Sequence, residues 1–347
     1  MSSKKQISVG NIKIGGGAAI SVQTMTNTKT EDINATLDQI RLAAEMGCDL
    51  IRVSCPTPES TVAIKKIVQN SSLPIIADIH FNYKRAIEAI EAGVACVRIN
   101  PGNTPDNGIK EIVKAAKENN VAIRIGINSG SIEKNILDKH GEPSIEAIVE
   151  SAVSNCHKLE DLGFFSFKVS VKSSDVITTI KSYRKLSKLI DYPLHIGITE
   201  SGTFFPGSIK SAIGIGSLLA DGIGDTIRVS LSDDIREEVR VGRQILKSLG
   251  VLKNTINVVS CPTCSRTLID VIGISKALND YCDSVKKDLK ISILGCVVNG
   301  IGEAKNADIG IFGFKSGIAK LYVKGKEIEE LKESDIFGIV SKLITEL

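Results

Sequence analysis

The chain has 347 residues and a mass of 37.1 kDa, which is more than one compact core usually needs and favours a large domain joined to a small one. Its formal charge of +3 is too small to indicate nucleic acid or a membrane surface as a partner. Aromatic residues make up only 4% and tryptophan is absent, so platforms for stacking nucleic-acid bases are not expected either.

No apolar run reaches the length of a membrane span, and the first ten residues, MSSKKQISVG, lack the apolar stretch of a signal peptide. We therefore expect a cytoplasmic protein. Eight cysteines in a cytosolic chain of this size argue against a disulfide framework. Core packing, metal binding and redox chemistry remain as uses for the thiols.

Short β-branched runs alternate with longer amphipathic segments from residue 18 to about residue 250. The expected strands are 19–23, 50–54, 74–78, 95–99, 121–126, 164–170, 193–198 and 225–230. An open doubly wound sheet also alternates strands and helices, but eight such units favour a barrel. The stretch GIGS at 214–217 lacks the glycine pattern of a dinucleotide fold. We predict an α/β chain, with a (β/α)8 TIM-type barrel over 1–252 and a small α+β domain over 253–347.

Basic side chains interrupt five of these otherwise apolar strands. They are Arg52, Arg98, Arg124, Lys168 and Arg228. Each lies within the last few residues before a loop, and the carboxyl ends of the strands form the catalytic mouth of such barrels. A single base is about as often paired with a structural carboxylate, but several buried bases in one place would be very costly without anions. The set predicts a mouth that binds a phosphate or diphosphate.

Further polar residues occur at the same strand ends. They are His80, Asn100, Asn128, Lys172, His195 and Ser230. The acids at this level, Asp78 and Glu200, are too few to neutralise the bases and could take part in the chemistry. A histidine near a strand end is more often structural than catalytic. Lys172 continues the inward face of its strand, which makes it a good candidate for contact with a ligand.

Cysteines form a second candidate site in the C-terminal part. Residues 258–266 read VVSCPTCSR, and we expect Cys261 and Cys264 near the start of a helix, where free N–H groups stabilise thiolates. Cys296 follows another apolar run. A pair plus a distant third cysteine is common to zinc and iron–sulfur sites. A redox pair is less favoured, because nothing upstream resembles the βαβ unit of a thioredoxin.

Either metal site needs a fourth ligand, which could be Cys282, Glu303 or an exogenous group. Cys282 lies in a helical stretch, where a cysteine is more often a small core residue. Glu303 follows residues 299–302, whose two glycines predict a turn that folds back towards Cys296. An oxygen ligand is more exchangeable than a thiolate and would leave one iron open to substrate. The cysteines expected in the core are Cys48, Cys96 and Cys156.

Nine stretches, in one order across nearly the whole chain, carry a resemblance to a known family. They are SVQTMTNTKT (21–30), ADIHFNYKRA (77–86), VRINPGN (97–103), RIGINSGS (124–131), VSVKSSDV (169–176), LHIGITESG (194–202), GIGDTIRVSLS (222–232), CPTCSRT (261–267) and GCVVNGIGEA (295–304). With them the chain resembles the bacterial two-domain 4-hydroxy-3-methylbut-2-en-1-yl diphosphate synthases of the non-mevalonate isoprenoid pathway.

The resemblance implies a barrel joined to a domain that carries a [4Fe–4S] cluster. It implies a homodimer in which the cluster domain of one subunit closes over the barrel mouth of the other. The implied reaction opens 2-C-methyl-D-erythritol 2,4-cyclodiphosphate and reduces it by two electrons, with loss of water, to 4-hydroxy-3-methylbut-2-enyl diphosphate. Reduced flavodoxin or ferredoxin would supply the electrons.

The resemblance also assigns roles to residues. The expected cluster ligands are Cys261, Cys264, Cys296 and Glu303. The residues expected to bind the diphosphate are Arg52, Arg98, Arg124, Asn128, Lys172, Arg228 and Ser230. The expected catalytic residues, around the hydroxyl groups of the substrate and at the cluster, are Glu200, Asp78, Asn100 and Glu303.

Two positions depart from the family pattern, which commonly has proline where this chain has Ile301 and histidine where it has Ser129. The first loses a rigid turn, and the second loses a hydrogen-bond donor near the diphosphate. Two other interpretations are compatible with the same motifs. One is a barrel that binds phosphorylated sugars or pterin-like ligands beside a structural zinc domain, and the other is a non-catalytic iron–sulfur sensor.

Overall fold

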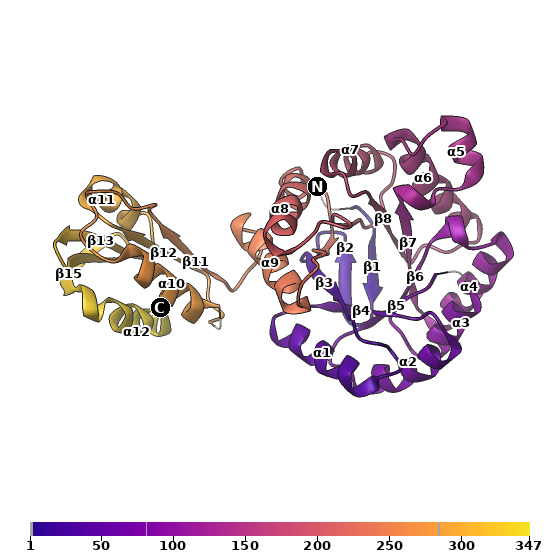
Figure 1. The fold of residues 1–347 in the computed structure, drawn as a ribbon, viewed down its shortest axis with the longest axis horizontal. Helices are drawn as coiled ribbons and strands as arrows, with labels where there is room; N and C mark the ends of the chain where they lie inside the picture. Colours follow the sequence, from indigo (N-terminus) through magenta and orange to yellow (C-terminus); the bar gives the residue numbers. More distant parts are fainter. Residues whose placement is uncertain (1–2, 81, 284) are drawn as a thin grey trace. The chain divides into compact units, whose positions relative to one another are not determined.

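The computed structural model describes residues 3–80, 82–283 and 285–347. The chain divides into two compact units, Met1–Leu249 and Gly250–Leu347, and each has a sheet of its own (Figure 1). This division lies next to the boundary at 252/253 that the sequence predicts. Among the helices in the described part of the chain, none is long and apolar enough to cross a membrane.

The first unit is an eight-stranded parallel barrel. Its strands are β3 (Ser21–Met25), β4 (Leu50–Ser54), β5 (Ile75–Asp78), β6 (Cys96–Ile99), β7 (Ala122–Asn128), β8 (Phe167–Lys172), β9 (His195–Ile196) and β10 (Thr226–Ile227). They follow the order β8-β7-β6-β5-β4-β3-β10-β9, and a bridge between Val169 and Leu194 joins β8 to the segment leading into β9. The (β/α)8 barrel predicted from eight alternating units is confirmed.

Helices surround the strands on the outside (Figure 1). They are α1 (Ile33–Glu45), α2 (Pro58–Asn70), α3 (Lys84–Glu91), α4 (Asp106–Asn119), α5 (Lys134–His140), α6 (Ile145–Asp161), α7 (Val176–Leu186), α8 (Phe204–Ala220) and α9 (Ile235–Ser248). Side-chain caps fix where several of them begin: the Asp32 carboxylate accepts from the Ala35 N–H at α1, and Thr57 and Ser60 form a capping box before α2. The GIGS stretch at 214–217 lies inside α8.

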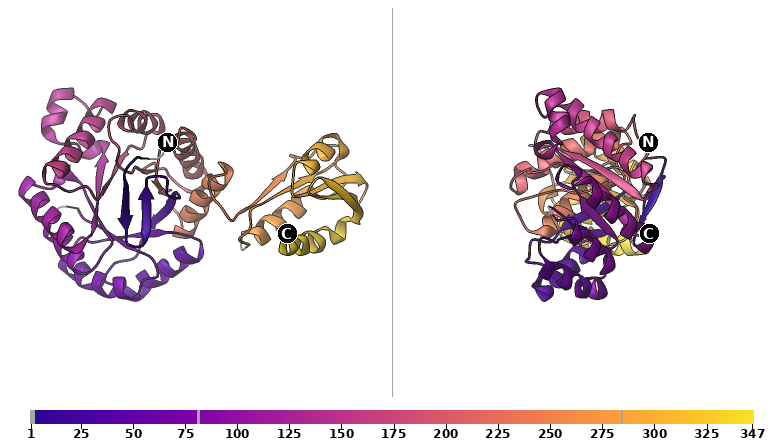
Figure 2. Two further views of the ribbon diagram at one scale, coloured as in Figure 1. Left: turned by 180° about the vertical axis from the view of Figure 1, so that it is seen from behind. Right: turned by 90° about the vertical axis from the view of Figure 1, so that its right-hand side faces the viewer.

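A hairpin that the sequence did not predict closes one end of the barrel. Its strands β1 (Gln6–Val9) and β2 (Ile12–Gly15) pair antiparallel. Ile7, Val9 and Ile14 pack against apolar residues at the start of β4, β5, β6 and β7. Figure 2 shows the hairpin lying across the centre of the barrel when it is seen from behind. Because the amino ends of the strands are plugged, a ligand has to enter at their carboxyl ends.

The second unit is a five-stranded sheet between helices, consistent with the predicted α+β domain. Its strands lie in sequence order: β11 (Ile256–Ser260), β12 (Leu289–Leu294), β13 (Ile309–Lys315), β14 (Ile318–Val323) and β15 (Lys326–Lys332). The first three are parallel and the last two antiparallel to their neighbours. Two separate hydrophobic clusters form its core: α10 (Val271–Cys282) and α12 (Ile336–Glu346) contribute to one, and α11 (Val297–Lys305) to the other.

Candidate functional site

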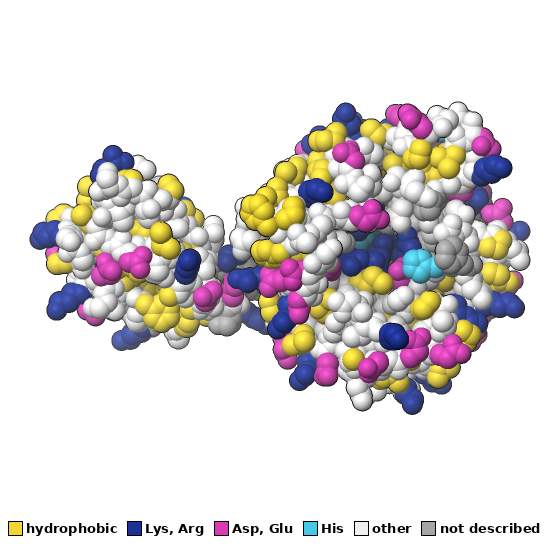
Figure 3. Space-filling view, viewed as in Figure 1, with side chains coloured by type: hydrophobic (Ala, Val, Ile, Leu, Met, Phe, Trp, Pro, Cys, Tyr) yellow, Lys and Arg dark blue, Asp and Glu magenta, His cyan; other side chains and the backbone are white. Residues whose placement is uncertain are grey.

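Strand register aligns four charged side chains of neighbouring strands. The row runs from Asp78, the last residue of β5, to Lys168, the second residue of β8, so the expectation that Lys168 lies at the end of its strand is wrong. Asp78 on β5 pairs with Arg98 on β6, Arg98 pairs with Arg124 on β7, and Arg124 pairs with Lys168 on β8. Residues paired in register project on the same face of a sheet, so the four side chains form one row. All four are buried. Figure 3 shows Lys and Arg side chains in a hollow at the centre of this unit.

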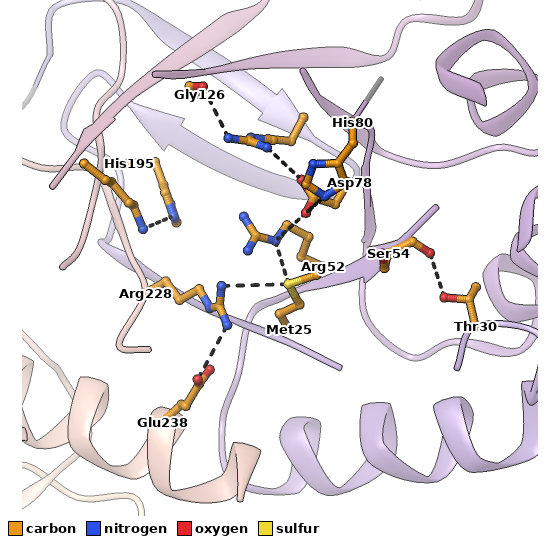
Figure 4. Close-up of polar contacts among 12 residues, drawn as sticks. Met25, Thr30, Arg52, Ser54, Asp78, His80, Gly126, His195, Arg228 and Glu238 are labelled. Carbon is orange, nitrogen blue, oxygen red and sulfur yellow. Dashed lines mark hydrogen bonds and ion pairs between the residues drawn. The ribbon is translucent and has the colours of Figure 1, made fainter. Parts of the chain in front are cut away.

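Asp78 is the centre of one charge network. Its carboxylate lies 3.8 Å from Arg52 Nε, 3.5 Å from Arg98 Nη1 and 3.3 Å from His80 Nε2 (Figure 4). Burial by itself would raise the pKa of Asp78, but the charge of Arg52, a hydrogen bond from His80 and the charge of Arg98 outweigh it and hold the pKa well below its usual range. Asp78 is therefore an anion that orients two arginines.

Glu238 forms a second network on the other side of the mouth, and the sequence analysis missed it. This buried residue of α9 lies 3.5 Å from Arg228 Nη2 and accepts hydrogen bonds from Thr24 Oγ1 at 2.5 Å and the Leu231 N–H at 2.9 Å. Arg236, Glu237 and Arg240 lie close to it in the sequence, which gives it the appearance of a surface residue. The signal that could have found it is its helical spacing from Ile235 and Gly242, which places it on the buried face.

The mouth contains five bases and only these two buried carboxylates, so it keeps a net positive charge. The bases are Arg52, Arg98, Arg124, Lys172 and Arg228. Within the described residues, Nε and Nη1 of Arg124 and Nε of Arg228 have no hydrogen-bond partner. Burial, and then the charges of neighbouring arginines, lower the pKa values of Arg124 and Lys172 well below normal. Buried donors without partners are costly, and the oxygen atoms of an anion would satisfy them.

Two glycines make room for these long side chains. Arg98 Nη2 donates to the Gly126 carbonyl at 3.3 Å, and a Cβ on Gly126 would lie 2.9 Å from that same nitrogen. A Cβ on Gly197 would lie 2.9 Å from Lys172 Nζ. The Lys172 nitrogen itself lies 3.5 Å from Nε2 of His195, a fully buried ring whose pKa burial holds well below normal. His195 is thus a neutral ring beside Lys172.

The two predicted asparagines occupy different positions at the mouth. Asn100 is buried directly after β6, and its Oδ1 accepts from the Gly102 N–H at 3.1 Å, so it caps the turn that follows. Asn128 is the last residue of β7 and the register partner of Lys172 on β8. Register therefore places Asn128 beside the bases.

Glu200 and Ser230 lie in the loops after β9 and β10. Glu200 is exposed and has a left-handed backbone with φ of 51°, which costs energy for a residue other than glycine or asparagine. Such strain occurs often at functional sites. The Ser230 carbonyl accepts a hydrogen bond from the Ser201 hydroxyl, which ties the two loops together.

Two of the predicted cluster cysteines follow neighbouring strands of the second unit. β11 and β12 are parallel, with Ser260 paired to Ile293, so Cys261 and Cys296 leave the sheet at the same edge. The N–H of Gly295 donates to Cys261 Sγ at 3.2 Å. Cys296 is the N-cap residue of α11. Free N–H groups near both sulfur atoms would stabilise thiolates.

The expectation that Cys261 and Cys264 lie at a helix start is wrong. The next helix, α10, begins only at Val271. Instead the chain turns at Thr263, whose φ is 62°, and the Cys264 N–H donates to Thr267 Oγ1 at 3.0 Å. A left-handed residue between the cysteines is incompatible with a helix that begins there, and the turn leaves Cys264 exposed.

The turn predicted at 299–302 is also absent, because these residues belong to α11. Gly300 serves packing instead, because a Cβ there would lie 2.5 Å from the side chain of Phe312 on β13. Glu303 follows Cys296 by seven residues, about 10 Å along a helix axis. Its Oε2 lies 3.6 Å from Nζ of Lys290, near the start of β12 and away from the cysteine edge.

In residues 3–80, 82–283 and 285–347, no three His, Cys, Asp or Glu side chains converge closely enough to hold a metal ion. The three cysteines nevertheless suit an iron–sulfur cluster in donor chemistry, and two of them share a strand edge. Glu303 as a fourth ligand remains a prediction. Cys282 lies in the hydrophobic core of the second unit, and the other cysteines, Cys48, Cys55, Cys96 and Cys156, are buried in the barrel unit.

Comparison with solved structures finds the same barrel in proteins of distant sequence. A type I 3-dehydroquinate dehydratase from Clostridium difficile superposes with a TM-score of 0.52 at 14% identity, over 72% of this chain and 98% of that one. A dihydropteroate synthase from Stenotrophomonas maltophilia gives 0.50 at 12% identity, over 67% and 93%. At such identities the likeness concerns the fold alone.

Curated sequences give much closer matches. The 4-hydroxy-3-methylbut-2-en-1-yl diphosphate synthase (flavodoxin) of Zymomonas mobilis is 51% identical over 98% of this chain and 90% of its own length. The proteins of that name from Clostridium perfringens and Caldanaerobacter subterraneus are 49% and 50% identical, and each is covered over 97% of its length. The GcpE TIM-barrel domain matches residues 4–243, and the GcpE protein C-terminal domain matches residues 257–346. The chain belongs to the GcpE family.

Proposed function

We propose that this chain catalyses the reductive ring opening and dehydration of 2-C-methyl-D-erythritol 2,4-cyclodiphosphate to 4-hydroxy-3-methylbut-2-enyl diphosphate. The observation that carries the proposal is the mouth of the barrel, where five bases face two buried carboxylates and several guanidinium nitrogens lack partners in the described residues. A cyclic diphosphate supplies the charge and the acceptor oxygens that this mouth lacks. Relatives at about half identity carry the name of this activity.

In the proposed complex the bases hold the two phosphate groups. The residues assigned to them are Arg52, Arg98, Arg124, Asn128, Lys172, Arg228 and Ser230. Asp78 stays ionised and orients Arg52 and Arg98. Glu200 and Asn100 are placed beside the hydroxyl groups of the substrate, where the exposed carboxyl of Glu200 could exchange a proton with the leaving oxygen.

Cys261, Cys264 and Cys296 are the proposed ligands of a [4Fe–4S] cluster, with Glu303 as the fourth. Such a cluster, when bound, supplies the two electrons singly. To reach it, Glu303 must leave Lys290 and turn towards the cysteine edge. A reduced flavodoxin, named in the relatives, or a ferredoxin would deliver the electrons.

We also propose a homodimer, with helix α8 of the barrel as the contact surface. Four of its side chains are apolar and exposed, in part at helical spacing: Phe204, Phe205, Ile209 and Ile213. The exposed fraction of Phe205 is 74%. Hydrophobic side chains gather over this helix in Figure 3. We call these four residues the α8 patch. A second copy of the chain would remove the patch from water.

The test starts from protein purified without oxygen. We expect a brown protein with broad absorbance near about 400 nm, iron bound to the chain, and turnover of the cyclodiphosphate with reduced flavodoxin. Cys264→Ser should lose colour, iron and turnover. Cys282→Ala is the matched control in the same unit, since Cys282 lies in the hydrophobic core, and it should keep its iron.

Two outcomes would favour other functions. A colourless protein with one zinc per chain would exclude the redox proposal and favour a phosphorylated-ligand barrel with a structural zinc domain. A brown protein that binds a diphosphate but never turns over the cyclodiphosphate with a strong one-electron donor would favour an iron–sulfur sensor.

A further inference from the structure

Among the bases of the mouth, Arg228 has its carboxylate partner on a helix and not at a strand end. Its Nη2 faces Glu238 Oε1 at 3.5 Å, and its Nη1 lies 3.8 Å from the sulfur of Met25 (Figure 4). The same sulfur lies 3.1 Å from Arg52 Nε. A thioether is only a weak acceptor, so the carboxylate is the stronger of the two partners.

Glu238 is itself fixed by three separate elements. It projects from the first turns of α9, where the helix dipole favours a carboxylate. One oxygen accepts from the hydroxyl of Thr24 on β3, and the other accepts from the N–H of Leu231 in the loop after β10. A side chain that is only 5% exposed and bound on both oxygens has little freedom. The direction in which Arg228 points is therefore set from α9.

From this geometry we propose that Glu238 is a positioning residue for diphosphate binding, which acts by aiming the Arg228 guanidinium into the mouth of the barrel. The proposal rests on the proposed diphosphate site. It adds a residue of the following helix to a site otherwise built from strand ends. Glu238 itself does not contact the ligand, because a carboxylate repels an anion and its oxygens already have partners.

A purely electrostatic role for Glu238 makes the opposite prediction. If the carboxylate only reduced the positive charge of the mouth, its removal would add one net positive charge and tighten the binding of any anion. If it aims Arg228, its removal releases the guanidinium and weakens binding despite the added charge. The sign of the change in affinity therefore decides between the two roles.

The experiment measures the affinity of the full-length, anaerobically purified protein for inorganic pyrophosphate by titration calorimetry. We expect Glu238→Gln to weaken binding about tenfold, equal to about 1.4 kcal/mol. Thr24→Val removes one hydrogen bond to Glu238 without changing any charge, and we expect it to weaken binding about threefold, near 0.7 kcal/mol. It keeps the inference testable if Glu238→Gln does not fold.

Two further variants separate positioning from general damage. Glu237→Gln makes the same charge change one residue away, where the side chain pairs with Arg240 at 3.9 Å, and it should leave pyrophosphate affinity within about twofold. Arg228→Met should weaken binding by itself. In the Arg228→Met background, Glu238→Gln should cause no additional loss, because a positioning residue has nothing left to position.

Pyrophosphate binding by Glu238→Gln that is as tight as wild type, or tighter, would overturn the inference. An additional loss in the Arg228→Met background would do the same, since it would reveal damage unrelated to Arg228. These results differ from a failure of the proposed site. In that case the wild-type protein would not bind pyrophosphate, or Arg228→Met would bind it as tightly as wild type, and the inference would fall with the site.

Discussion

Lys168 is the last member of the row that Asp78, Arg98 and Arg124 begin. It is fully buried, and among the described residues its Nζ has no hydrogen-bond partner. Its register partner is Arg124, and the buried thiol of Cys96 on β6 is a second titratable neighbour. Burial first, and then the charge of Arg124, lowers the pKa of Lys168 to about 8. A lysine in this state destabilises the fold whenever it is protonated.

This shift predicts how stability depends on pH. Above pH 8 the folded chain releases the proton of Lys168, while the unfolded chain keeps it until about pH 10.5. Stability from this group therefore rises with pH, by at most about 1.4 kcal/mol per unit in that window. We expect Lys168→Met to be more stable than wild type at pH 7. This advantage in the free energy of unfolding should shrink from pH 8 to pH 9.5 in urea unfolding experiments.

The control for this prediction is Lys65→Met at an exposed site on α2. Equal slopes for both variants would contradict the assignment to Lys168.

At the same scale, the sequence predicts the basic side chains of the mouth better than their partners. Arg52, Arg98 and Arg228 stand out because a base inside an apolar strand needs an explanation. Glu238 does not stand out, since a glutamate in a helix is ordinary and its burial results from tertiary packing. Met25 is also ordinary until the fold brings its sulfur between two arginines.

At the scale of elements, the hydrophobic periodicity of the sequence predicts the barrel strands correctly. Glycine is a less certain signal, because it occurs both in turns and where a helix packs closely. Glycine-rich residues 299–302 predict a turn, but the structure continues α11 through them. Gly300 and Gly310 instead allow α11 to lie close to β13, since a Cβ on Gly310 would overlap the backbone of Ala304. The hairpin β1–β2 is missed because each strand has four residues and too few alternations to be read.

Close packing of α11 on β13 predicts opposite effects for two glycine substitutions. Gly310→Ala should destabilise the second unit by about 1–3 kcal/mol, because backbone atoms cannot move aside cheaply. Gly302→Ala meets no atom within 4 Å and should stabilise α11 by up to about 1 kcal/mol. Thermal unfolding, followed by calorimetry, measures both. If Gly302 instead served a turn, Gly302→Ala would destabilise the unit, contrary to this expectation.

At the scale of the whole molecule, the chain consists of two units with separate cores. The barrel carries the proposed anion site, and the second unit carries the proposed cluster cysteines. Composition and length alone predict such a division, because 347 residues exceed a single core. The proposed contact surface on α8 is less accessible to sequence reasoning, because the exposure of apolar residues on a helix depends on what the fold places beside them.

The α8 patch makes the proposed homodimer testable. Phe205 is 74% exposed, and a charged side chain there would be buried without a partner in any interface that covers the helix. We expect Phe205→Arg to convert a dimer into a monomer in analytical ultracentrifugation, with thermal stability of the barrel unchanged. Val62 on α2 is the matched control, because it is 70% exposed on the same barrel but lies outside the patch, so Val62→Arg should leave the dimer intact. A Phe205→Arg protein that sediments as a dimer would place the interface elsewhere. Loss of turnover in a monomeric but folded variant would indicate that each barrel needs the second subunit.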